Sequence, residues 1–356
     1  MLENKSVKEI ISNLHSGKYK VKEVVKFYLD RIQAYNPTLN AIVSKKNDDE
    51  IIKQAEKYDL DNLKKKPLAG LPFASKDLLD VNGFPTTYGF PGYKNYFPNK
   101  NSLIVDRLID AGAIIIGKTN TAELGIGGHT TNRLFGETSN AYNFSKSSGG
   151  SSGGAGAAVM AGIGALAHGN DIGGSLRFPA AANGAFTVKP GLGRVPAWNP
   201  TQKAERGMLA QSMSVQGVIT RSALDLELAM PTLVRSDPRD PFHVPLPYRM
   251  SVKSNNLKVA YWCETPGFDT HPAVYKALTA AAEALRDAGY EVEEKEPPLL
   301  EETARAGYGA LLGEVAELMG PDIRKFGSET IQNIFAEYFR QFRPAKDLNL
   351  LKAMAK

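Results

Sequence analysis

The sequence predicts an α/β fold, because segments with the periodicity of amphipathic helices alternate along the chain with short apolar segments rich in β-branched residues. The composition agrees with a globular protein: of 356 residues, 42% are hydrophobic and 23% are charged. A chain of this length can bury a sizeable core without covalent cross-links. Its single cysteine, Cys263, excludes an intrachain disulfide.

Helices are predicted in the N-terminal part of the chain. Ser6 is a favourable N-cap, and apolar residues follow it at helical spacing. A second amphipathic helix begins at Val21 and is expected to end at Asn36-Pro37. A third, more polar helix is expected near residues 47–58.

Two buried strands are predicted next, with a helix between them. Residues 67–80 are apolar and bounded by turn residues, as expected of a strand and its exit loop, and residues 103–111 have helical periodicity. Residues 113–116 are predicted to form a strand, because β-branched side chains fit a pleated sheet. Residues 112–119, GAIIIGKT, also satisfy the letter pattern of a phosphate-binding loop. However, isoleucines fill the loop positions, which favours the strand over a nucleotide site.

A segment rich in glycine, serine and alanine, residues 145–195, differs from its surroundings. Within it, residues 155–167 interleave apolar and small residues, the pattern of a helix packed closely on all sides. Residues 236–257 are rich in proline, arginine and serine and are expected to form a surface loop. A strand–helix–strand unit is predicted after this loop, at residues 258–261, 272–288 and 291–293.

Three segments carry residue types that suit hydrolytic chemistry. Lys76 follows an apolar run; a lone lysine is usually exposed, but a lysine buried at a strand end has a lowered pKa and can act as a base. Ser175 follows two glycines, in a turn whose N–H groups could stabilise an oxyanion, with an incidental serine in a glycine turn as the alternative. Residues 149–154, GGSSGG, allow unusual backbone conformations and, taken alone, indicate a flexible loop or an anion-binding nest.

Together these segments resemble the amidase signature family of serine hydrolases. The resemblance rests on GLPFASKDLLDVNG at residues 70–83, on the GGSSGG run and on DIGGSLRFPA at residues 171–180, and it extends from about residue 5 to residue 295. It implies one large amidase domain over residues 1–356, with a central mixed β-sheet flanked by helices. The family's last strand region has no counterpart after Glu293, so the domain is expected to be truncated at its C-terminus.

The resemblance implies hydrolysis of the C–N bond of a carboxylic amide through an acyl-enzyme on Ser175. Ser151 would follow a cis peptide bond and bridge Ser175 to Lys76, which in its neutral form would accept the proton. Asp171 and Arg177 would support the turn, with a plain surface role as the alternative for Arg177. The oxyanion would be held by three N–H groups, those of Ile172, Gly173 and Gly174.

Some positions depart from the family pattern and leave alternatives open. Asn170 stands where threonine or serine is common, and Met160 where a small residue is usual. Phe178 stands where the glutamine amidohydrolase subunit of tRNA-dependent amidotransferases usually carries glutamine, which weighs against that subfamily. Residues 168–171 are more similar to the branch that hydrolyses linear or cyclic small amides. The expected truncation leaves a catalytically silent homologue as a further alternative.

The expected partner is a small-molecule amide substrate, with no cofactor and no metal. The five histidines and one cysteine lack metal-ligand spacing, and His168 is expected to be a packed or surface residue. The net charge of +5 is scattered along the chain, which does not indicate a nucleic-acid partner. No apolar run is long enough to span a membrane and no signal sequence is visible, so a cytoplasmic protein is expected. A homodimer is compatible with the sequence.

Overall fold

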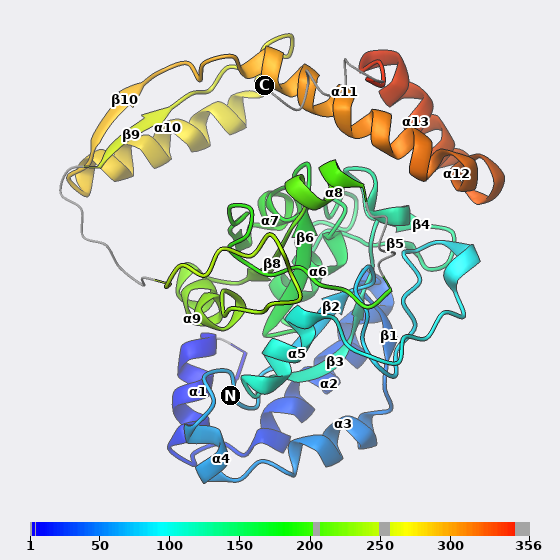
Figure 1. Ribbon diagram of the computed structural model, residues 1–356. Coiled ribbons are helices and arrows are strands. Elements are labelled where there is room, and N and C mark those ends of the chain that lie inside the picture. Colours follow the sequence, from blue (N-terminus) through cyan, green and yellow to red (C-terminus); the bar gives the residue numbers. More distant parts are fainter. Residues whose placement is uncertain (1, 4, 202–206, 249–256, 346–356) are drawn as a thin grey trace. The chain divides into compact units, whose positions relative to one another are not determined.

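The computed structural model describes residues 2–3, 5–201, 207–248 and 257–345 (Figure 1). The chain forms two compact units: unit 1 contains residues 1–248 and 319–336, and unit 2 contains residues 249–318 and 337–356. The segments that carry the predicted chemistry all lie in unit 1. A single amidase domain over residues 1–356 stays a prediction.

Unit 1 is built around a six-stranded mixed sheet with the strand order β1-β3-β2-β6-β8-β7. Strand β2 is parallel to both of its neighbours, β3 and β6, whereas the pairs β1–β3, β6–β8 and β7–β8 are antiparallel. The α/β class and the central mixed sheet are therefore confirmed. The strands of the sheet are β1 (Ile42–Lys45), β2 (Pro72–Lys76), β3 (Ile114–Thr119), β6 (Leu166–Asp171), β7 (Phe186–Thr187) and β8 (Val215–Thr220), and a small hairpin consists of β4 (Thr131–Asn132) and β5 (Gly136–Glu137).

Helices pack against this sheet (Figure 1). Helix α6 contacts β2, β6 and β8, while α3 and α5 contact β3 and α9 contacts β8. The α-helices of unit 1 are α1 (Val7–His15), α2 (Val21–Leu39), α3 (Asp48–Ala55), α4 (Leu60–Lys64), α5 (Leu103–Asp110), α6 (Gly153–Met160), α7 (Arg177–Asn183), α8 (Met208–Met213), α9 (Ala223–Leu233) and α12 (Gly320–Phe326). Two short 3₁₀ helices are η1 (Pro91–Tyr93) and η2 (Glu123–Gly125).

Helices α1 and α2 follow the sequence prediction except at the end of α2, whereas α4 was not predicted. Ser6 caps α1: its Oγ accepts the N–H of Glu9 at 3.2 Å, and the Glu9 carboxylate accepts the N–H of Ser6 at 2.9 Å. The expected end of α2 at Asn36-Pro37 is wrong, because the helix continues to Leu39. A proline in the last turn removes one N–H donor, and the helix ends where Asn40 takes a left-handed conformation with φ 52°.

The helix predicted over residues 155–167 is too long. Helix α6 ends at Met160, Gly162 takes a left-handed conformation with φ 67°, and β6 begins at Leu166. Apolar residues continue through this break because nearly all of the segment is buried, with Met160 and Ala161 half-buried. A segment that is apolar on all sides gives no periodicity that marks where the helix ends.

Unit 2 contains the predicted strand–helix–strand unit. Strands β9 (Lys258–Tyr261) and β10 (Glu291–Glu294) pair in parallel, and α10 (Pro272–Asp287) connects them. Helix α11 (Leu300–Leu318) follows, and α13 (Glu329–Gln341) includes residues of both units. The predicted surface loop forms no helix or strand over its described part, residues 236–248, and its residues 249–256 lie outside the described ranges. No helix in the described ranges is long and apolar enough to cross a membrane.

The sheet brings the chemically important segments to one edge. Strands β2 and β6 are parallel, so their last residues, Lys76 and Asp171, lie at the same edge of the sheet. Helix α6 packs closely against the segment that follows β3: a Cβ at Gly154 would lie 2.5 Å from the backbone nitrogen of Asn120. Glycine at the start of α6 therefore lets the loop that precedes this helix reach the end of β2.

Candidate active site

Lys76, the predicted base, is the last residue of β2 and is fully buried. Its Nζ lies 2.6 Å from Ser151 Oγ. Burial lowers the pKa of Lys76 well below its ordinary value of 10.5, and the negative charge of Asp171 opposes only part of this effect. Burial thus favours the neutral amine, which is the form that can act as a base.

The loop before α6 presents Ser151 at the end of β2. The Gly150–Ser151 peptide bond is cis, which confirms the sequence prediction. Thr130 fixes this loop from outside: its hydroxyl donates to the carbonyl of Gly149 at 2.8 Å and accepts the N–H of Gly153 at 2.9 Å. Ser151 itself is 1% exposed, so its hydroxyl is held away from bulk water.

Asp171 organises the turn between β6 and α7. Its buried carboxylate accepts the N–H of Gly174 at 2.8 Å and the N–H of Leu176 at 3.1 Å. Arg177 donates to the same carboxylate through Nε and Nη2, both at 3.0 Å. Burial alone would raise the pKa of Asp171, but Arg177 and the two N–H groups outweigh burial and lower it. The Arg177 side chain is half exposed, yet its guanidinium is fixed on the turn.

One of the three predicted oxyanion donors makes a hydrogen bond within this turn. The N–H of Gly174 donates to Asp171 Oδ1 at 2.8 Å, so this group has an internal acceptor in this structure. The N–H groups of Ile172 and Gly173 remain from the predicted set. Ser175 is half-buried in the same turn. No hydrogen bond among the described residues joins Ser175 Oγ to Ser151, and catalytic hydrogen bonds often tighten only when substrate binds.

A row of polar side chains on β6 and β8 lies beside Lys76. Asn170 Oδ1 accepts from Lys76 Nζ at 2.7 Å, a contact to which the sequence assigned no role. His168 and Asn170 are two residues apart on β6, so their side chains share one face of the sheet. The His168 ring nitrogen Nε2 lies 2.9 Å from Gln216 Oε1 on β8. Burial lowers the pKa of His168 to about 3, so this fully buried residue is a neutral packed histidine, as expected.

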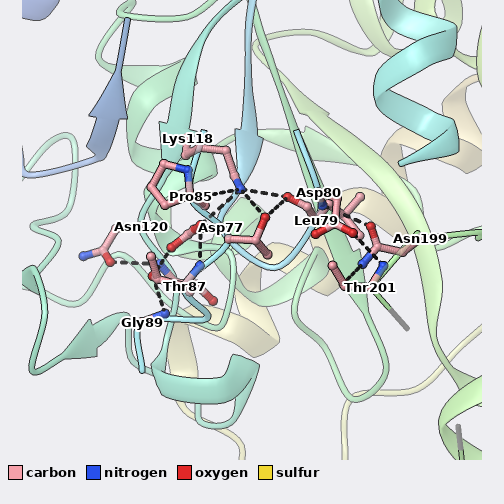
Figure 2. A network of polar contacts seen from close by, with 12 residues as sticks. Asp77, Leu79, Asp80, Pro85, Thr87, Gly89, Lys118, Asn120, Asn199 and Thr201 are labelled. Atoms are coloured by element: carbon pink, nitrogen blue, oxygen red, sulfur yellow. Dashed lines mark hydrogen bonds and ion pairs between the residues drawn. The ribbon is translucent and has the colours of Figure 1, made fainter. Parts of the chain in front are cut away.

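A second buried lysine, Lys118 on β3, holds the loop that leaves β2 (Figure 2). Its Nζ lies 3.1 Å from Asp77 Oδ1 and donates to the carbonyls of Leu79 at 2.7 Å and Pro85 at 3.1 Å. Asp77 also accepts the N–H and the hydroxyl of Thr87. Lys118 therefore lies on a strand, and its ammonium group is already bound within the protein. This excludes residues 112–119 as the phosphate-binding loop that the letter pattern suggested.

The same loop is tied to a distant segment of unit 1. Asp80 donates its N–H to Asn199 Oδ1 at 3.0 Å, and its carboxylate accepts the N–H of Thr201 at 2.8 Å (Figure 2). Together with the Asp77–Lys118 pair, these contacts fix the chain directly after Lys76. The predicted base is thus carried by a strand whose end is held by these contacts.

Sequence reasoning missed two side chains near the predicted base, Asn170 and Thr130. Asn170 was visible as a departure from the family pattern, and its place between His168 and Asp171 on a strand next to β2 is the signal that could have identified it. Thr130 lies outside the motifs, and its two contacts depend on a loop that only the fold brings near residues 149–153.

Comparison with known proteins agrees with this arrangement. A family model described as Amidase matches residues 23–356. An indoleacetamide hydrolase of Bradyrhizobium diazoefficiens is 41% identical over 323 residues, which cover 90% of this chain and 62% of the relative. One of the subunits of the glutamyl-tRNA(Gln) amidotransferase of Thermus thermophilus is 34% identical over 306 residues, which cover 84% of this chain and 62% of the relative. The chain thus spans 62% of the length of both curated relatives.

Solved structures give the same result. A bacterial aryl acylamidase that belongs to the amidase signature enzymes superposes with a TM-score of 0.82 at 26% identity, and the match covers 99% of this chain and 75% of that chain. The match to the family model also continues beyond residue 295, where the resemblance in the sequence was expected to end. The match to the family model, which agrees with the sheet and the buried lysine–serine contact, shows that the chain belongs to the amidase signature family.

Proposed function

We propose that this chain carries an amidase site that hydrolyses the C–N bond of a carboxylic amide through an acyl-enzyme. Ser175 Oγ attacks the carbonyl carbon, and its proton passes through the Ser151 hydroxyl to neutral Lys76. The N–H groups of Ile172 and Gly173 stabilise the oxyanion. When the C–N bond breaks, Lys76 returns the proton through Ser151 to the leaving nitrogen. Water then cleaves the ester in the same way and releases the carboxylic acid.

The observation that carries this proposal is the contact between Lys76 and Ser151. A fully buried lysine amine lies 2.6 Å from a hydroxyl that is 1% exposed, at the edge of the sheet where the turn to Ser175 begins. Burial lowers the pKa of this lysine, which favours the neutral amine that can accept a proton. A base poised in this way suits proton transfer from a serine nucleophile.

The proposed substrate class is a small carboxylic amide. One relative is named for indoleacetamide and one neighbour for aryl acylamide chemistry, and both names point to an amide with an aromatic group. Phe178, which follows Arg177, is 48% exposed, and its ring lies next to Gly128. This exposed ring beside the turn of Ser175 offers an apolar surface on which an aromatic group can pack.

A glutamine amidohydrolase is the second candidate, because one relative with 34% identity belongs to a glutamyl-tRNA(Gln) amidotransferase. Phe178 argues against it, since an exposed phenylalanine cannot hydrogen-bond the polar end of glutamine. Ammonia release from glutamine and from indoleacetamide, measured side by side, separates the two candidates. Release from glutamine alone would favour the second candidate, and release from neither together with no labelling by a serine-reactive probe would favour a catalytically silent homologue.

Covalent labelling tests the proposal directly. A fluorophosphonate probe should label the wild-type protein on the peptide that contains Ser175, and Ser175→Ala should abolish the labelling. Ser145→Ala is the matched control, because Ser145 is exposed and should leave labelling unchanged. Labelling that persists in Ser175→Ala would remove Ser175 as the nucleophile.

A further inference from the structure

We infer that Asn170 is a positioning residue that orients the Lys76 amine, so that the nitrogen lone pair points at the Ser151 hydroxyl. The inference rests on the proposed function and adds to it a residue that the proton path does not include. It follows from the chemistry of the three polar groups that meet at the end of β2.

The geometry fixes one N–H of the neutral amine. Lys76 Nζ lies 2.7 Å from Asn170 Oδ1 and 2.6 Å from Ser151 Oγ. An amide oxygen only accepts hydrogen bonds, so Asn170 takes one N–H of Lys76. A neutral amine has two N–H groups and one lone pair. With one N–H fixed on Asn170, the lone pair is free to accept the proton of Ser151, which is the direction that the proposed transfer needs.

Asn170 is itself held in place by its strand. It lies directly opposite Gln216 in the antiparallel pair β6–β8, and its carbonyl accepts the Ser152 hydroxyl at 3.4 Å. The preceding residue has no room for a side chain: a Cβ at Gly169 would lie 2.8 Å from Leu176 Cδ2 and 3.0 Å from Ser152 Oγ. The close packing at Gly169 fixes the strand, and therefore the amide beside Lys76.

The charges around Lys76 make a neutral amide suitable at this position. On β6, His168 is neutral and the carboxylate of Asp171 is turned toward Arg177. On β3, Lys118 is paired with Asp77. A carboxylate in place of the Asn170 amide would lie within hydrogen-bond reach of Nζ and stabilise the ammonium form. An amide orients the amine without adding that charge.

The first test measures the protonation of Lys76 itself, so that it does not depend on turnover. Protein labelled with ¹³C in its lysine side chains is titrated by NMR, and Lys76→Met assigns the signal. Asn170→Asp should raise the pKa of Lys76 by at least about one unit relative to wild type. Asn13→Asp is the control: Asn13 is half-buried on α1, outside the elements that carry Lys76, Ser151 and Asn170. Equal pKa values in all three proteins would overturn the inference.

The second test measures orientation through the rate of fluorophosphonate labelling of Ser175. Asn170→Leu should slow labelling by about 10- to 100-fold, within the range that positioned acid–base groups contribute. Asn170→Thr, which restores an accepting oxygen on a strand residue, should recover most of the rate. Equal labelling rates in Asn170→Leu and Asn170→Thr would overturn the inference. This test does not need Asn170→Asp, so it holds even if that variant fails to fold. A wild-type protein that titrates at Lys76 but is not labelled would instead refute the proposed function alone.

Discussion

Lys76 and Lys118 form a natural comparison, because they lie on neighbouring strands of one sheet and have opposite surroundings. Both side chains are fully buried, and in the parallel pair β2–β3 Lys118 lies opposite Ser75, one residue before Lys76. Side chains alternate along a strand, so the two ammonium groups point to opposite faces of the sheet. Lys118 contacts the carboxylate of Asp77, whereas the hydrogen bonds of Lys76 among the described residues go to the neutral oxygens of Ser151 and Asn170.

The difference shows that two buried lysines of one sheet suit different roles, one in stabilising the fold and the other in proton transfer. Burial lowers the pKa of Lys118, but Asp77 and Asp80 oppose the effect, and the ion pair holds the loop after β2. Lys76 lacks a paired carboxylate in the part of the chain that the structure describes, and its pKa falls well below its ordinary value. An unpaired buried lysine costs stability and therefore indicates function, whereas a paired one indicates architecture.

The largest expected effect is on catalysis, at Lys76. Lys76→Met should reduce acylation of Ser175 by about 10⁴-fold, because the proton acceptor is lost while the apolar stem is kept. Lys76→Arg should be equally inactive, because a guanidinium is not deprotonated at working pH. The rate of fluorophosphonate labelling measures the effect, and Lys53→Met on the exposed side of α3 is the control. A Lys76→Arg variant with near-normal labelling would refute the assignment of Lys76 as the base.

The next effect is on stability, at Lys118. Lys118→Met should lower the free energy of unfolding of unit 1 by about 3–5 kcal/mol, because it leaves the buried carboxylate of Asp77 without its cation. The two tryptophans, Trp198 and Trp262, lie in different units, so urea unfolding followed by fluorescence in a Trp262→Phe background reports on unit 1. A Lys118→Met variant as stable as wild type would contradict the structural role of the pair.

This comparison also shows how much the sequence could predict. Lys76, Ser151 and Ser175 were identified as candidates from local motifs, and the family resemblance implied the cis bond before Ser151, which the structure contains. The pairing of Lys118 with Asp77 did not, because it depends on the register between two strands about 40 residues apart in the chain. For the same reason no partner could be predicted for Asn170, and the occupied N–H of Gly174 became visible only with the turn in place.

The fold was predictable where periodicity or capping marks an element. Helix α1 has both a cap and an apolar stripe, and its start after Ser6 was predicted. Helix α6 has neither a polar face nor a capping side chain, so its end at Met160 could not be located. Both misplaced helix ends, at Pro37 and at Met160, are set by residues in left-handed conformations, which the sequence only suggests.

Lys76→Met is expected to change the free energy of unfolding less than Lys118→Met does, and in the opposite direction. The folded-state pKa of Lys76 is lowered, so between that value and 10.5 the unfolded chain binds one more proton than the native state. Lys76→Met removes this penalty and should raise the free energy of unfolding near neutral pH. The gain should shrink by up to about 1.4 kcal/mol for each pH unit toward 10.5. Urea unfolding at several pH values measures it, and a gain that does not change with pH would contradict the lowered pKa.

The smallest effect is expected when both members of the structural pair are changed, and it tests whether the pair acts as a unit. In the wild type, Asp77→Asn leaves the buried ammonium of Lys118 without its carboxylate and should destabilise unit 1. In the Lys118→Met background the same substitution removes an uncompensated charge. The new amide oxygen can still accept the N–H of Thr87, which Asp77 accepts at 3.2 Å. Asp77→Asn should therefore cost less than about 1 kcal/mol there, or stabilise the protein. The four proteins form a double-mutant cycle measured by urea unfolding. Equal costs of Asp77→Asn in both backgrounds would mean that Lys118 and Asp77 are not coupled, and the contrast with Lys76 would then rest on burial alone.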